Sequence, residues 1–182
     1  MPQKIKLGLI YGSVREGRFC DKVAGWAAGE IGRDGRFAAT IIDPRDLDAK
    51  RTEIGHHLDE ADAFVIVTPE YNHGYPGALK SLIDTYGRQW QIKPLAFVSY
   101  GGVSGGLRAI EQLRLVFAEL HTVGIRDTVS FANPWNSFDD NGGLTDPANA
   151  QRAMKTLLGR LHWWAVTLRD ARMASPYAEV AA

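Results

Sequence analysis

The amino-acid sequence predicts an α/β fold in which a five-stranded parallel sheet lies between two layers of helices. Short apolar runs alternate with segments of helical periodicity along the chain, as is typical of parallel sheets with crossover helices. The length of 182 residues suits one domain with a sizeable core. Right-handed crossovers limit the topology, and the strand order 2-1-3-4-5 fits a chain with five strands.

The strands are predicted from continuous apolar runs, which are typical of strands buried on both faces of a sheet. The run Ala63-Phe64-Val65-Ile66-Val67 is the clearest of them. We expect the five strands, in order, at residues 5–11, 37–42, 63–68, 95–99 and 125–131.

The helices are predicted from apolar residues that recur every three or four positions. The helix after the fourth strand, for example, carries Leu107, Ile110, Leu113 and Phe117 on one face. We expect helices at residues 18–32, 52–60, 77–86, 107–123 and 147–172. Residues 1–174 then form a single domain, and residues 175–182 form a loose C-terminal tail because they contain few anchoring side chains.

Composition excludes several classes of protein. Lys and Arg together number 21, as do Asp and Glu, so the net charge is zero and a nucleic-acid partner is not expected. The single cysteine excludes an intrachain disulfide, and the apolar runs are too short for a signal peptide or a membrane span. We therefore expect a cytoplasmic protein with no membrane partner.

The loop after the first strand reads Gly12-Ser13-Val14-Arg15-Glu16-Gly17-Arg18. Backbone N–H groups at the start of a helix attract anions, Ser13 adds a hydroxyl, and the two arginines add charged donors. The loop lacks the Gly-Lys-Ser/Thr of a Walker A loop and the Gly-x-Gly-x-x-Gly of a dinucleotide site. We expect it to bind a single phosphate group, the alternative being a βα turn that merely carries polar side chains.

The loop after the third strand reads Thr68-Pro69-Glu70-Tyr71-Asn72-His73-Gly74-Tyr75-Pro76-Gly77. It lies at the carboxyl end of a strand, where open α/β sheets bind ligands. Tyr71, Tyr75 and the two prolines offer flat apolar surfaces, and Asn72 and the loop amides offer hydrogen bonds. These are the groups that a planar heteroaromatic ligand requires.

The loop after the fourth strand reads Ser99-Tyr100-Gly101-Gly102-Val103-Ser104-Gly105-Gly106. Its four glycines allow the backbone to approach a ligand closely and to adopt positive φ angles. We expect Ser104 to act as the N-cap of the helix that follows.

Together these three motifs resemble the NADPH-dependent FMN reductase family, which is flavodoxin-like and includes quinone, azo-dye and chromate reductases. The matching patterns are Gly12-Ser13-x-Arg15-x-Gly17-Arg18, Thr68-Pro69-Glu70-Tyr71-Asn72 and Gly101-Gly102-x-Ser104-Gly105-Gly106. They occur in order, each at the end of a predicted strand. The resemblance implies a flavodoxin-like three-layer sandwich that holds FMN without a covalent bond.

The implied activity is that of an oxidoreductase that passes hydride from NADPH, or NADH, to bound FMN. The electrons then go to a quinone, a flavin or a similar small acceptor by a ping-pong mechanism. The flavin N5 carries the hydride, so no catalytic side chain and no metal are expected. The competing hypothesis is a flavodoxin-like electron carrier or flavin-binding module without NAD(P)H oxidase activity.

The resemblance and the loop chemistry predict cofactor contacts from all three loops. The expected residues are Ser13, Arg15, Arg18, Phe19 and Cys20 in the first, Pro69, Glu70, Tyr71, Asn72 and His73 in the second, and Tyr100, Gly101, Gly102, Val103, Ser104 and Gly105 in the third.

Several of these residues have two interpretations. Glu70 either assists a substrate or forms a structural hydrogen bond or an intersubunit ion pair, and His73 either donates a proton or lies on the rim of the site. Cys20 is interpreted as a packing residue or a backbone donor beside the phosphate. Trp90 and Trp135 are predicted in loops, where they line the substrate cleft or contact another subunit. The neutral charge, these aromatics and the resemblance predict a homodimer or homotetramer.

Overall fold

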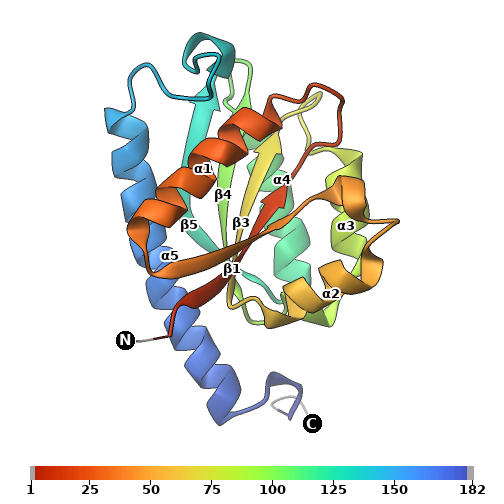
Figure 1. The fold of residues 1–182 in the computed structure, drawn as a ribbon. Helices are drawn as coiled ribbons and strands as arrows, with labels where there is room; N and C mark the ends of the chain where they lie inside the picture. Colours follow the sequence, from red (N-terminus) through yellow and green to blue (C-terminus); the bar gives the residue numbers. More distant parts are fainter. Residues whose placement is uncertain (1–2, 180–182) are drawn as a thin grey trace.

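The computed structural model describes residues 3–179 and contains a five-stranded parallel sheet between two helical layers (Figure 1). The strands are β1 (Ile5–Tyr11), β2 (Phe37–Ile42), β3 (Ala63–Pro69), β4 (Pro94–Gly101) and β5 (Val123–Ala132). Their order in the sheet is β2-β1-β3-β4-β5, and every neighbouring pair is parallel. The predicted flavodoxin-like fold class and strand order are therefore confirmed.

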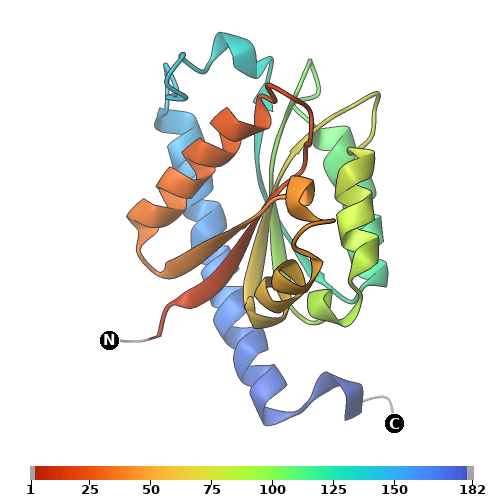
Figure 2. The ribbon, with the colours of Figure 1, turned by 45° about the vertical axis from the view of Figure 1, so that its right-hand side comes forward.

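Two helical layers cover the two faces of the sheet. Helices α1 (Cys20–Asp34) and α5 (Ala148–Ala174) pack on one face, and α2 (Arg51–Glu60), α3 (Gly77–Thr85) and α4 (Leu107–Glu119) pack on the other (Figures 1 and 2). Successive side chains of β3 alternate between these layers: Val65 and Val67 face α1 and α5, whereas Phe64 and Ile66 face the other layer. Short 3-10 turns lie at η1 (Pro44–Asp46), η2 (Arg88–Trp90), η3 (Pro134–Asn136) and η4 (Tyr177–Glu179).

The predicted helices are all present, with shifts at their ends. Helix α1 begins at Cys20, two residues later than expected, because the preceding loop extends further. Helix α4 ends at Glu119 rather than at residue 123, because the chain turns through His121, whose φ is 56°, to enter β5 at Val123.

Trp90 corrects one prediction made from the sequence. It follows α3 in a short connection, yet its side chain has no exposed surface. Its indole N–H donates to the carbonyl oxygen of Tyr86 at 2.8 Å, and its ring packs edge-on against Phe64 and Phe117. Trp90 is therefore a core residue at the amino edge of the sheet and does not line a cleft. Trp135, by contrast, is 58% exposed.

The C-terminal residues follow α5 beyond the amino edge of the sheet (Figure 1). Within them the hydroxyl of Tyr177 lies 2.6 Å from Nδ1 of His121. The loose tail at residues 175–182 stays a prediction, and residues 180–182 lie outside the described part of the chain. No helix in residues 3–179 is long and apolar enough to cross a membrane.

Candidate cofactor site at the carboxyl edge of the sheet

The structure brings the three predicted loops together, because β1, β3 and β4 are neighbours in the sheet. The strands end level with one another: Tyr11 pairs with Val67, and Pro69 pairs with Tyr100. The loops that follow these strands therefore meet at the carboxyl edge, the upper edge in Figure 1. All of the predicted site residues lie in or beside them, although their use in binding a cofactor stays a prediction.

The first loop, residues 12–19, is called the phosphate loop below. Its first residue must be glycine, because a Cβ on Gly12 would lie 2.8 Å from the carbonyl oxygen of Val67. Ser13 is fully buried beneath the loop. Among the hydrogen bonds of the described residues, none is donated by the backbone N–H groups of Glu16, Gly17 and Phe19. These donors precede α1, where the helix dipole adds to their attraction for an anion.

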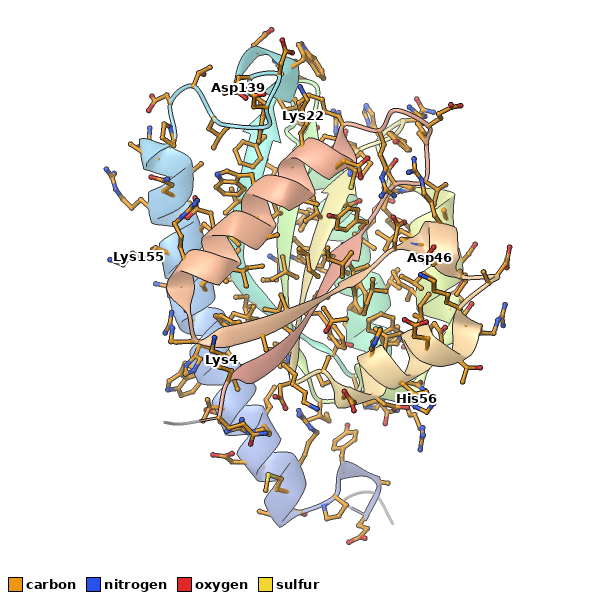
Figure 3. The ribbon with its side chains drawn as sticks, viewed as in Figure 1. Lys4, Lys22, Asp46, His56, Asp139 and Lys155 are labelled. Carbon is orange, nitrogen blue, oxygen red and sulfur yellow. The ribbon has the colours of Figure 1, made fainter. Side chains whose placement is uncertain are left out.

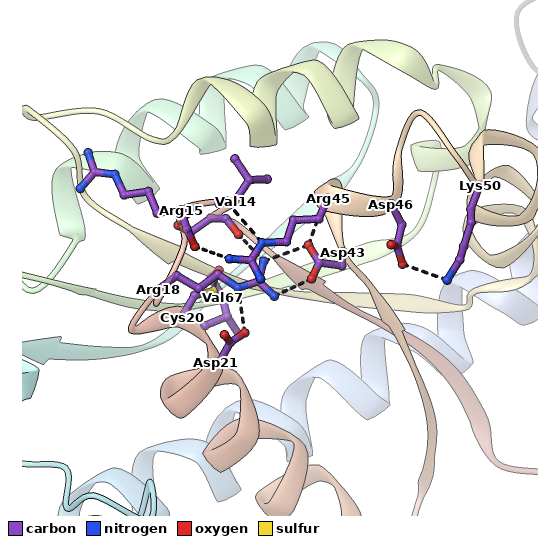
Figure 4. A network of polar contacts seen from close by, with 11 residues as sticks. Val14, Arg15, Arg18, Cys20, Asp21, Asp43, Arg45, Asp46, Lys50 and Val67 are labelled. Atoms are coloured by element: carbon purple, nitrogen blue, oxygen red, sulfur yellow. Dashed lines mark hydrogen bonds and ion pairs between the residues drawn. The ribbon is translucent and has the colours of Figure 1, made fainter.

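The two arginines of the phosphate loop have different surroundings. Arg15 is exposed, and its guanidinium carbon lies 3.6 Å from the centre of the Tyr71 ring. Arg18 is buried: its Nε donates to Asp21 at 2.7 Å, its Nη1 and Nη2 donate to Asp43 at 2.9 and 2.5 Å, and Nη1 also donates to Ser13 O (Figure 4). Burial acts to lower the pKa of Arg18, but the two carboxylates outweigh it and raise that pKa. Among residues 3–179, the Arg15 guanidinium forms no hydrogen bond, whereas that of Arg18 is engaged by Ser13, Asp21 and Asp43.

The second loop forms a tight reverse turn at residues 71–74. Asn72 and His73 both have positive φ angles, 50° and 68°, and the backbone of Tyr71 exchanges hydrogen bonds of 2.9 and 3.0 Å with Gly74. Two successive residues of positive φ are typical of a type I′ turn, in which asparagine is favoured. The hydroxyl of Tyr71 lies 2.8 Å from that of Ser13, so this turn is joined to the phosphate loop.

Glu70 connects the second loop to the third. Its carboxylate accepts hydrogen bonds from the Ser104 hydroxyl at 2.6 Å, from the Arg108 backbone N–H at 3.1 Å and from Arg108 Nε at 2.6 Å. Burial acts to raise the pKa of Glu70, but these donors outweigh it and leave the pKa below its ordinary value. Of the interpretations left open by the sequence, the structure supports the structural hydrogen bond.

His73 shares one of the partners of Glu70. Nη1 of Arg108 lies 2.9 Å from Nε2 of His73. A guanidinium group only donates hydrogen bonds, so Nε2 is an acceptor in this contact. The backbone oxygen of His73 accepts a further bond from Gln112 at 2.8 Å, which holds the tip of the turn against α4.

Ser104 is not the N-cap that the sequence predicted. Helix α4 begins at Leu107, and the N-cap is Gly106, which has no side chain to form a capping bond. The Ser104 hydroxyl donates to Glu70 instead. Gly105 has a φ of 61°, and a Cβ there would collide with the hydroxyl of Ser130, so this position also requires glycine. Val103, at the tip of the loop, is 86% exposed.

Phe19, Cys20 and Tyr100 pack beneath the loops. The rings of Phe19 and Tyr100 are 5.9 Å apart, and the Cys20 thiol donates to the Val67 carbonyl oxygen at 3.6 Å. Burial raises the pKa of the Cys20 thiol and also that of the Tyr100 hydroxyl. Both groups are therefore neutral and buried, and for Cys20 the packing interpretation is supported, whereas its role as a backbone donor beside a phosphate stays a prediction.

Sequence reasoning missed the residues that hold these loops from outside. Asp43 and Arg45 reach the phosphate loop from the β2–α2 connection, and Arg108 holds Glu70 from α4. The backbone N–H of Asn133 donates to Gly101 O at 2.8 Å. The signal available in the sequence was topological: β2 is next to β1 in the predicted order, so polar residues directly after β2 lie beside the first loop.

Comparison with known proteins identifies the family. The family model described as NADPH-dependent FMN reductase matches residues 5–136. The chain belongs to this family. An NAD(P)H-dependent FMN reductase of Schizosaccharomyces pombe is 37% identical in an alignment 131 positions long that covers 58% of this chain and 65% of that protein. A quinone reductase of Pseudomonas putida is 30% identical over 166 residues, covering 80% of this chain and 88% of the relative.

Coverage of the curated relatives varies. The alignment with an NAD(P)H:quinone oxidoreductase of Solanum tuberosum, for example, covers 55% of that protein, and several other relatives are covered over less than two thirds of their length. Among solved structures, the flavoenzyme NAD(P)H:(acceptor) oxidoreductase FerB from Paracoccus denitrificans has a TM-score of 0.73 at 22% identity, with 90% of this chain and 98% of that chain covered. A flavodoxin from the domain Archaea has a TM-score of 0.59 at 17% identity. These structural similarities establish the fold.

In the described part of the chain, no group of three or more His, Cys, Asp or Glu side chains is arranged to hold a metal ion. His56, a residue type that often binds metals, lies on α2 and points outward, away from the carboxyl edge (Figure 3).

A contact from α1 holds the loop that follows β5. Lys22 of α1 donates to the carbonyl oxygen of Asp139 in this loop at 2.9 Å (Figure 3).

Proposed function

We propose that this protein is an FMN-dependent NAD(P)H oxidoreductase that reduces a quinone, a flavin or a similar small acceptor. The observation that carries the proposal is the meeting of three loops of complementary chemistry at one edge of the sheet. Membership of the family supports FMN and NAD(P)H as its cofactor and co-substrate, and the names of its relatives support a quinone as acceptor.

The phosphate loop fits the phosphate group of FMN. The N–H groups of Glu16, Gly17 and Phe19 are available before α1, and Arg15 can leave the Tyr71 ring to pair with a phosphate oxygen. The loop contains one exposed arginine and one buried arginine, so we assign the direct charged contact to Arg15. Arg18 then contributes by shaping the loop.

The second and third loops fit a flat heteroaromatic ring. Tyr71 offers a ring face, Asn72 offers an exposed amide, and a Cβ built on Gly102 would meet no atom within 4 Å, so there is open space beside the third loop. No hydrogen bond of the described residues is donated by the backbone N–H groups of Gly102 and Val103. Such donors favour the polar edge of a flavin and stabilise negative charge that develops there.

Bound FMN would accept hydride from NAD(P)H and pass the electrons to the acceptor, so no side chain of the site is required for this redox chemistry. Glu70 is held as a carboxylate by Ser104 and Arg108, so it is a clamp between loops rather than a proton donor. The exposed Val103 tip leaves one side of the site open, which allows NAD(P)H and the acceptor to occupy the same position in turn. This shared position predicts ping-pong kinetics.

We also propose that the protein is a homodimer or homotetramer. Trp135 is exposed, and aromatic side chains are enriched in interfaces. Leu107 and Leu115 of α4 add exposed apolar surface. Trp90 is buried and cannot contribute to an interface, so the proposal is supported by these three residues together with the neutral net charge and the family resemblance. Light scattering at micromolar protein tests it, and a monomer of 20.1 kDa that keeps FMN and full activity would overturn it.

Steady-state kinetics with NADPH and a quinone test the activity. Turnover should require FMN, and double-reciprocal plots at several quinone concentrations should give parallel lines. An electron carrier would hold the flavin without oxidising NADPH, which would exclude the enzyme. Intersecting lines would show that both substrates bind together, and the shared position would then be wrong.

A further inference from the structure

The turn at residues 43–46, after β2, lies beside the phosphate loop, because β2 is the neighbour of β1 in the sheet. Asp43 and Arg45 extend from this turn to the loop (Figure 4). Neither residue belongs to the three motifs, and the proposed function gives neither of them a role.

Guanidinium groups bind three successive carbonyl oxygens of the phosphate loop. Arg18 donates to Ser13 O, Arg45 Nε donates to Val14 O at 3.3 Å, and Arg45 Nη2 donates to Arg15 O (Figure 4). In a planar trans peptide the C=O and the following N–H point in opposite directions. Holding these carbonyls toward the β2 turn therefore directs the N–H groups of Val14 and Glu16 away from it, whereas the N–H of Arg15 donates to the Ser13 hydroxyl at 3.4 Å.

This arrangement favours an anion on the far side of the loop. Carbonyl oxygens carry negative partial charge and repel a phosphate, whereas a row of N–H groups attracts it. The two guanidinium groups thus remove the repulsive atoms from the anion's side and leave the attractive ones there.

Asp43 fixes the first of these guanidinium groups. Its two carboxylate oxygens accept from Arg18 Nη1 and Nη2, and one of them also accepts the backbone N–H of Arg45 at 3.0 Å. Only 4% of the Arg18 side chain and 19% of the Asp43 side chain are exposed. Burial acts to raise the pKa of Asp43, but Arg18 and the Arg45 N–H outweigh it and lower that pKa, so the pair stays ionised.

We propose that Asp43 and Arg45 are positioning residues for the phosphate group of FMN. They hold the phosphate loop in the shape that presents its N–H groups, without contacting the phosphate. The inference rests on the proposed function, since it requires FMN as the ligand.

The test compares Arg45→Met with Lys50→Met. Arg45 is exposed, so its replacement does not disturb the core. Lys50 is an exposed cation four residues from Asp46, with which it pairs at 3.1 Å, and it has no bond to the phosphate loop (Figure 4). Each variant loses one positive charge from the same region, so a general electrostatic effect would appear in both.

Binding is measured by quenching of flavin fluorescence, with FMN and with riboflavin, which has the same ring system and no phosphate. Arg45→Met should raise the Kd of FMN about tenfold, since two hydrogen bonds that shape the loop are lost. Its Kd for riboflavin should stay at the wild-type value, and Lys50→Met should leave both constants unchanged. Arg45→Lys, which keeps one donor group, should recover part of the FMN affinity.

Asp43→Asn should weaken FMN binding as Arg45→Met does, and Asp46→Asn is its control. Thermal unfolding of the apoprotein shows whether the Asp43→Asn variant folds. If that variant does not fold, Arg45→Met alone decides the test. Equal FMN affinity for Arg45→Met and Lys50→Met would overturn the inference. Equal losses for FMN and riboflavin would also overturn it, because the effect would not depend on the phosphate. Wild-type protein that binds FMN no better than riboflavin would overturn the phosphate assignment in the proposed function itself.

Discussion

Glu70→Gln tests whether the carboxylate of Glu70 clamps the second loop to the third. Glutamine has the same shape but no charge, and the site offers the carboxylate three donors, from Ser104 and Arg108. Hydrogen bonds to charged groups contribute about 1.5–3 kcal/mol each, but they are not additive and Arg108 is partly exposed. We expect the free energy of unfolding to fall by about 2–3 kcal/mol, which corresponds to about 5–10 °C in Tm for a chain of this size.

Urea unfolding of the apoprotein measures this loss without a contribution from FMN binding. Glu111→Gln is the matched control, because Glu111 is a 78% exposed carboxylate of α4 that lies 3.8 Å from Arg114, and its loss should cost less than about 0.5 kcal/mol. The folded pKa of Glu70 is below its ordinary value of 4.5, so its contribution is complete above that pH and disappears as the pH falls through the folded pKa. Equal stability of the two variants at neutral pH would refute the clamp.

Three further predictions concern single residues. Arg15→Ala should weaken FMN binding by about 1.5–3 kcal/mol, measured as flavin content after dialysis. Arg33 is an exposed arginine of α1, so the control variant Arg33→Ala should retain FMN. Full retention of FMN by Arg15→Ala would refute the phosphate contact. Asn72→Gly keeps the positive φ of the turn and should alter the flavin spectrum and turnover without loss of stability, whereas Asn72→Ala should also destabilise the fold by about 1 kcal/mol. An unchanged spectrum and turnover in Asn72→Gly would remove this amide from the site. Lys93 is buried with its Nζ 2.6 Å from Leu58 O, and burial and then Arg172 lower its pKa to about 8 from 10.5. Between these two pKa values the unfolded chain keeps a proton on Lys93 that the folded chain has released. The free energy of unfolding of the wild type should therefore rise from about pH 8 to pH 10 by about 1–3 kcal/mol relative to Lys93→Met. Parallel pH profiles of the two proteins would contradict this.

The sequence was sufficient for the fold because the signals that define it are local. Apolar runs and helical spacing predicted every strand and helix, and parallel strands with right-handed crossovers left few topologies. The three loops followed from the same reasoning, because each is adjacent in sequence to the strand that positions it.

What the sequence did not predict depends on contacts between distant residues. Trp90 follows a helix in a short connection, and its burial arises from Phe64 and Phe117, which are far away in the chain. Arg18 has the local sequence context of a phosphate ligand, but Asp43, 25 residues later, engages it. Local patterns identify which residues reach the carboxyl edge, but not which of their donors are already used.

The central claim is that the three loops bind FMN and expose it to NAD(P)H. The most direct measurement is the visible absorbance spectrum of the protein after incubation with FMN and gel filtration, followed by anaerobic addition of NADPH. The account predicts a yellow protein with about one FMN per chain, whose visible band is lost on addition of NADPH and returns when a quinone is added. A colourless protein after gel filtration, or a flavin band that NADPH leaves unchanged, would contradict it.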